Sequence, residues 1–96
     1  MPYAVVRHYK WSPDLIDELG RRTDEVTKLI RDIEGFISYA LVRTDDGGYS
    51  VSIYETSEGV EESTRQAREW VQQNLSHLKP APPEVLQGKT LIQFNR

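Results

Sequence analysis

The most informative stretch of this sequence is residues 36–55, FISYALVRTDDGGYSVSIYE. Its two ends are rich in β-branched and aromatic residues, which predicts strands near 36–44 and 48–56. The centre holds an Asp-Gly step between apolar runs. This pattern is typical of a hairpin, because a tight primed turn requires positive φ. These residues therefore predict an antiparallel pair of strands.

The predicted hairpin register pairs Thr44 with Tyr49, whether the loop is short or longer. It places Tyr39 opposite Tyr54, with Leu41 on the same face, because side chains alternate across a strand. One face of the hairpin is then aliphatic, and the other is aromatic and polar. A Tyr39–Tyr54 pair would either stack or polarise a phenolic substrate.

The other elements follow from periodicity and from residues that start and stop helices. Residues 3–10 have the composition of a strand. Ser-Pro-Asp at 12–14 starts a helix, and apolar residues at helical spacing extend it over 13–33. A second amphipathic helix covers 57–78 and stops before a proline-rich segment. A last strand is predicted near 90–95.

The order β-α-β-β-α-β predicts a single ferredoxin-like α+β domain over residues 1–96. Right-handed crossovers then give a four-stranded antiparallel sheet in the order 4-1-3-2, with both helices on one face. We expect Tyr39, Tyr54, Ile37 and Leu41 on the other face, where they would form an apolar patch that a soluble monomer rarely exposes. Pairing with a second copy would cover this patch, which predicts a homodimer with a shared barrel.

The composition excludes several classes of protein. Twelve Lys and Arg against fifteen Asp and Glu give a net charge of −3, without the basic excess of a nucleic-acid-binding protein. No apolar run is long enough to span a membrane. The chain has no cysteine, which fits a cytoplasmic location. A hydrophobic share of 38% is low for a small monomer and again favours a homodimer.

Two segments carry a family resemblance: residues 34–43, EGFISYALVR, and residues 51–58, VSIYETSE. They resemble the antibiotic biosynthesis monooxygenase-like branch of the dimeric α+β barrel superfamily. In this sequence Tyr54 stands where that branch typically has Trp. The resemblance implies a homodimer with one cavity per subunit, lying between the sheet and its helices or inside the barrel.

The resemblance also implies a range of activities. Members of the family include cofactor-independent oxygenases of aromatic polyketides, heme-degrading enzymes and a lactone isomerase. The heme-degrading type is similar in carrying a Trp on the second helix, a His ten residues later and an Asn on the first strand. Here Trp70 is followed at that spacing by Pro80, and Arg7 and His8 stand on the first strand. We therefore do not expect heme degradation.

Adjacent strand residues face opposite sides, so only one of Arg7 and His8 points into the barrel. Small Ala4 and Val6 suit the crowded helix side, which would send Arg7 to the barrel. An inward Arg7 would either bind an anionic or enolate oxygen or pair with Glu55 as a structural ion pair.

On the second predicted helix, Trp70, Asn74 and His77 share one face at spacings of four and three. They would line a pocket in which His77 acts as a base. Alternatively, Trp70 packs at a seam and His77 lies exposed near the helix C-terminus, where a cation is favourable.

Three functions compete at this point. The first is an oxygenase that acts without metal or bound cofactor on a small aromatic or phenolic compound. The second is a binding module for a small aromatic ligand, and the third is a structural dimer. The two histidines and scattered carboxylates lack the spacing of a metal site, and no glycine-rich phosphate loop occurs. The candidate catalytic residues are Arg7, His8, Tyr54 and His77, and the candidates for the pocket or dimer face are Tyr39, Leu41, Trp70 and Asn74.

Overall fold

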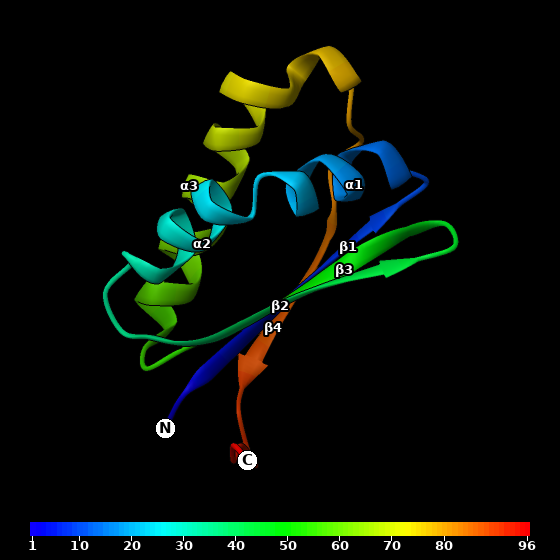
Figure 1. Ribbon diagram of the computed structural model, residues 1–96. Helices are drawn as coiled ribbons and strands as arrows, with labels where there is room; N and C mark the ends of the chain where they lie inside the picture. The colour runs from blue at the N-terminus through cyan, green and yellow to red at the C-terminus, as the bar shows by residue number, and fades with distance from the viewer.

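The computed structural model describes residues 1–96 and contains a four-stranded antiparallel sheet with its helices on one face (Figure 1). The strands are β1 (Tyr3–Lys10), β2 (Phe36–Thr44), β3 (Gly47–Tyr54) and β4 (Glu84–Lys89). The helices are α1 (Pro13–Arg21), α2 (Thr23–Arg31) and α3 (Ser57–Leu75), and a 3₁₀ turn, η1 (Ser76–Leu78), extends α3. The sheet order is β2-β3-β1-β4. This is the predicted 4-1-3-2 order seen from the other edge, so the ferredoxin-like α+β fold is confirmed.

The predicted helix over 13–33 is in fact two helices. At Arg22 the backbone leaves the helical region, with φ −102° and ψ 42°. Gly20 is a poor helix former, and the Thr23 hydroxyl donates a hydrogen bond to the Gly20 carbonyl at 2.6 Å. The break changes the direction of the chain, so that α1 and α2 each bury their own apolar side chains.

The hairpin register differs from the predicted one by two residues. Thr44 pairs with Gly47 rather than with Tyr49, so the turn is formed by Asp45 and Asp46. Positive φ falls on Gly47 (φ 155°) and not on the aspartates. A Cβ at Gly47 would collide with the backbone carbonyl of the neighbouring strand, so only glycine fits there. A shift of two preserves the alternation of faces, but Tyr39 now lies opposite Ser52 instead of Tyr54.

The fourth strand lies earlier than predicted, at Glu84–Lys89 instead of 90–95. It begins directly after the last proline, at the first residue able to donate a ladder hydrogen bond. It pairs with β1 from His8–Glu84 to Tyr3–Lys89, where β1 begins. The segment that follows leaves the sheet. Its apolar side chains Leu91, Ile92 and Phe94 are 79–85% exposed.

The helices cover the face of the sheet opposite to the one that we predicted. Arg7 and Tyr9 point toward the helices and are buried, whereas His8 lies on the face without helices. Tyr39, Leu41 and Tyr54 also belong to the helix side, where they form or contact the core. The prediction assumed that the helices would cover the aliphatic face. The helix-free face instead carries side chains that are mostly apolar, at Val6, Val42, Tyr49, Val51 and Ile53.

The core lies between the helices and the sheet. Its buried members are Val5, Tyr9, Leu15, Ile16, Leu19, Val26, Ile30, Ile33, Tyr54, Val60 and Leu75. None of the helices combines the length and the apolar character needed to cross a membrane.

Candidate functional site

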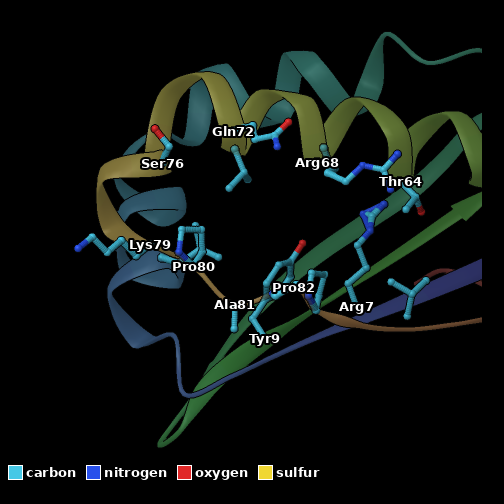
Figure 2. A pocket seen from close by; sticks show the side chains of 15 residues that line it. Arg7, Tyr9, Thr64, Arg68, Gln72, Ser76, Lys79, Pro80, Ala81 and Pro82 are labelled. Carbon is cyan, nitrogen blue, oxygen red and sulfur yellow. The ribbon is translucent and has the colours of Figure 1, made fainter.

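A hollow of about 490 Å³ lies between the sheet and α3, at the end of the molecule where η1 turns back (Figure 2). β1 contributes Arg7 and Tyr9, and α3 contributes one face between Thr64 and Gln72. The segment of residues 79–83 closes the remaining side. The hollow is therefore built from elements far apart in the sequence.

The wall formed by residues 79–83 has a simple local origin. Lys79 adopts the left-handed conformation (φ 50°), and its N–H donates to the Ser76 carbonyl, which ends η1 and reverses the chain. The prolines that follow have no N–H to satisfy and keep φ fixed, so the segment runs extended toward β4. This places Pro80 and Pro82 beside the hollow (Figure 2).

Arg7 is the central polar group of the hollow. Its side chain rises from β1 toward α3 and is only 2% exposed. One guanidinium nitrogen, Nη2, donates to Ser63 Oγ at 2.9 Å, and Ser63 in turn donates to the Val60 carbonyl at 2.8 Å. The Nε of Arg7 is buried without a hydrogen-bond partner. No carboxylate lies within 4.0 Å of Arg7, in contrast to Arg43, which pairs with a surface aspartate.

Three more buried polar atoms near Arg7 have no partner, the hydroxyl oxygens of Ser50, Ser52 and Thr64. Ser50 lies directly opposite Arg7 in the β1–β3 ladder, and Thr64 lines the hollow. Buried polar groups are nearly always hydrogen-bonded in proteins, so a cluster of unpartnered groups is typical of a binding site.

Two buried tyrosines accompany Arg7 on this side of the sheet. Burial raises the pKa of the Tyr9 phenol, and the nearby charge of Arg7 offsets part of that rise. Burial, with a further contribution from Tyr9, raises the pKa of Tyr39 to about 12. Both phenols are therefore neutral at pH 7 and act as hydrogen-bond donors rather than as bases. In Figure 2 the Tyr9 hydroxyl points into the hollow.

The charged residues that line the hollow are all cationic: Arg7, Arg68 and Lys79. None of the three belongs to an ion pair, whereas Arg65 on the same helix pairs with both Glu62 and Glu69. Arg68 extends toward Arg7, and Lys79 extends away from the hollow (Figure 2). The site therefore has a positive potential in a chain whose net charge is −3.

The other predicted catalytic residues do not line the hollow. His8 lies on the opposite face, stacked on Tyr49 with ring centroids 4.1 Å apart. Tyr54 is fully buried, and its hydroxyl donates to the Ile30 carbonyl at 3.3 Å. His77 is exposed in η1. Only Arg7 of the four predicted catalytic residues lies in the hollow.

The residues predicted for the pocket or dimer face also lie elsewhere. Trp70 packs against the core, and the guanidinium of Arg22 lies 5.8 Å from its ring centroid. The Asn74 amide donates to the Trp70 carbonyl within the same helix, at 2.9 Å. Tyr39 and Leu41 pack under the helices instead of on the helix-free face.

The residues present do not suit a metal or a heme. No group of three His, Cys, Asp or Glu side chains is arranged to hold a metal ion. Neither histidine lines the hollow, so the usual axial ligand of heme iron is missing from its walls.

Sequence reasoning missed Tyr9, Thr64 and Arg68. Thr64 and Arg68 are four residues apart on α3 and so share a face. The sequence signal that could have indicated this site is the pair Ser50 and Ser52. Their small polar side chains leave room next to Arg7 on a buried face of the sheet.

Comparison with known proteins agrees with this description. Residues 2–72 match the family model described as Antibiotic biosynthesis monooxygenase. No curated protein sequence gives a significant match.

Solved structures share the fold over nearly the whole chain. Rv0793 from Mycobacterium tuberculosis is 22% identical with a TM-score of 0.67, and the alignment covers 99% of this chain and 100% of that one. A protein of unknown function from Nitrosomonas europaea, NE2512, is 14% identical with a TM-score of 0.72 and coverages of 99% and 93%. The heme-degrader MhuD from Mycobacterium tuberculosis, solved with two hemes in its active site, is 13% identical with a TM-score of 0.68 and coverages of 97% and 99%.

At these identities the structural matches establish the fold, and the family model spans most of the sequence. The match to the family model also confirms the resemblance that the strand motifs indicated. The chain belongs to the antibiotic biosynthesis monooxygenase family.

Proposed function

We propose that this protein is a cofactor-independent monooxygenase that acts on a small aromatic or phenolic compound. The observation that carries the proposal is the hollow beside α3, where a buried and unpaired guanidinium, Arg7, meets apolar walls. Its volume of about 490 Å³ is within the range of small-molecule sites. Leu15, Val71 and Pro82 supply apolar surface against which a ring can pack.

The chemistry requires no external reductant. An activated ring CH₂ reacts with O₂ to give a ring C=O and one water, so the four electrons that reduce O₂ come from the substrate carbon. The reaction proceeds from the enolate or phenolate form of the substrate. Arg7 and the neutral Tyr9 phenol would donate hydrogen bonds to the oxygen that carries this negative charge, which stabilises it.

A non-catalytic binding module is the alternative function, and one observation favours it. No His, Asp or Glu lines the hollow, so no side chain there has an ordinary pKa near 7 and can take a proton from a substrate. A protein that only holds an aromatic ligand would need no such group.

Oxygen uptake separates the two functions. Purified protein is incubated with a panel of polyphenols that range from weakly to strongly acidic while dissolved O₂ is recorded. We expect consumption of one O₂ for each substrate oxidised, and a loss of at least about tenfold in rate for Arg7→Gln, because one donor to a developing oxyanion is worth that much or more. Arg65→Gln is the control, because it removes the same charge from the outer side of α3. No consumption with any substrate that binds would favour the binding module.

We further propose that the protein is a homodimer in the cytoplasm. The support for the dimer is the helix-free face, where Val42 is 47% and Tyr49 is 36% exposed beside Val51 and Ile53. Such a continuous, mostly apolar sheet face is rarely left in water. The cytoplasmic location rests on the cysteine-free composition.

A further inference from the structure

We infer that the ligand of the hollow beside α3 binds as an anion that is already ionised in solution: a flat aromatic molecule whose one anionic oxygen lies against Arg7. The inference rests on the proposed function for the role of the site, and it adds the charge and the protonation state of the substrate.

The first reason is the uncompensated charge of Arg7. A guanidinium has five N–H donors and a permanent positive charge. Arg7 is 2% exposed, makes one side-chain hydrogen bond, to Ser63, and leaves its Nε without a partner. A buried charge is normally compensated by an opposite charge and by hydrogen bonds. The protein supplies no acid at Arg7, so a ligand oxygen is the group that would complete its coordination.

The second reason is the sign of the surroundings. No Asp or Glu lines the hollow, and Arg68 adds a second guanidinium on the α3 side. No acid of that helix lines the hollow, and two of them, Glu62 and Glu69, form ion pairs with Arg65. A cationic ligand would meet only like charge, whereas a carboxylate or phenolate would meet two guanidinium groups that form no ion pair.

The third reason is the missing base. Burial raises the pKa of Tyr9 and holds Tyr39 near 12, so both are protonated at pH 7. His8 and His77 lie outside the hollow. The site can stabilise a negative charge but has no group that would generate one. The ligand must therefore lose its proton in water, and acidic phenols and carboxylic acids are selected over weakly acidic phenols.

The position of the walls adds to the argument. The family match ends at residue 72, yet the wall of residues 79–83 and Val85 lies beyond it. Part of the apolar side of the hollow is thus formed by a segment of the chain outside the matched region. The anionic end of the ligand would lie at Arg7 on β1, and its rings would lie against Val71 and Pro82.

The test compares two ligands of equal shape, 2-naphthoate and 2-naphthamide, by isothermal titration calorimetry on the full chain. We expect 2-naphthoate to bind about 10- to 100-fold more tightly, the usual difference made by a charge-assisted hydrogen bond. This preference should fall to near unity in Arg7→Gln and decrease severalfold in Arg68→Gln. Arg65→Gln should leave it unchanged, because Arg65 lies outside the hollow. Arg68 is exposed, so its variant reports on the site even if Arg7→Gln does not fold.

A second measurement follows the proton directly. The ionised and neutral forms of 4-nitro-1-naphthol absorb at different wavelengths, so its pKa can be measured free and bound. We expect the pKa of the bound naphthol to lie below that of the free compound, and to return to or exceed the free value in Arg7→Gln.

Three results would overturn the inference: equal or tighter binding of the amide, a raised pKa of the naphthol bound to the wild type, or no binding of 2-naphthoate at millimolar concentration. Its failure is distinguishable from that of the proposed function. Tight naphthoate binding without any oxygen uptake would leave the anion site standing and remove the oxygenase.

Discussion

Replacing Arg7 with Met should make the unliganded protein more stable while it abolishes anion binding. Methionine has a similarly unbranched, flexible side chain, shorter than that of arginine, which replaces the stem of Arg7 with apolar atoms. The substitution removes a buried charge that has one hydrogen bond and no counter-ion. Replacing buried ion pairs by apolar side chains stabilises proteins by about 1–4 kcal/mol, and here no pair energy is lost in exchange.

The losses that oppose this gain are small. The hydrogen bond to Ser63 disappears, but Ser63 keeps its own bond to the Val60 carbonyl at 2.8 Å and is not left unsatisfied. A hydrogen bond to a charged group contributes about 1.5–3 kcal/mol to stability. In the wild type, the desolvation of the buried guanidinium already offsets part of this contribution. We therefore expect a net gain of about 1 kcal/mol, which corresponds to a rise in Tm of roughly 4–8 °C for a chain of this size.

Thermal unfolding followed by circular dichroism measures the effect, at one fixed protein concentration because a dimer couples Tm to concentration. Ser63→Ala is the matched control. It removes the acceptor and keeps the charge, so it should lower stability by about 1–3 kcal/mol. A loss of stability in Arg7→Met as large as in Ser63→Ala would refute the reasoning, since it would mean that the guanidinium holds the fold together.

Two further predictions concern pH and assembly. Because the pKa of Tyr39 is raised to about 12 from 10.0, its contribution to stability is complete below pH 10 and is lost as the pH rises through 12. Urea unfolding of Tyr39→Phe should therefore show a weaker fall in stability over this range than the wild type does. Val42→Lys should halve the mass measured by light scattering, because Val42 lies exposed on the proposed dimer face. An unchanged mass, equal to that of Thr27→Lys on α2, would contradict the dimer.

The order of elements and of strands could be predicted from the sequence because both depend on local patterns. Period-two and period-3.6 runs identify strands and helices without knowledge of their neighbours. The break at Arg22 was missed because the apolar stripe continues through it in phase. The local features that separate the two helices are the non-helical backbone of Arg22 and the hydrogen bond from Thr23 to Gly20.

The hairpin register was missed because the contact that fixes it lies outside the hairpin. Gly47 must pass against the backbone of β1, where no side chain fits, and this requirement outweighs the local preference for an Asp-Gly turn. The position of β4 has a similar cause. β4 begins after the prolines that precede Glu84 and ends where β1 offers no further residue to pair with. The apolar residues Leu91 and Ile92 do not decide its position.

The largest difference concerns which face of the sheet the helices cover. Alternation fixes which side chains share a face, but it does not say which face is inside. The expectation that the aliphatic face meets the helices rests on the small side chains of Ala4 and Val6, which suit a crowded helix side. The structure instead places Arg7, Ser50 and Ser52 under the helices and leaves Val42 and Val51 on the other side.

This reversed arrangement links the two proposals. A sheet that buries an unpaired guanidinium and unsatisfied hydroxyls gives up stability on that face, and the cost is tolerated where those groups bind a ligand. The aliphatic face cannot offset this loss of stability while its side chains remain in water. Covering it with the same face of a second copy would remove apolar surface from solvent on both subunits, at about 25 cal/mol per Å². We therefore expect that weakening the dimer with Val42→Lys also destabilises each hollow, so that naphthoate binding becomes weaker at protein concentrations where the variant is monomeric.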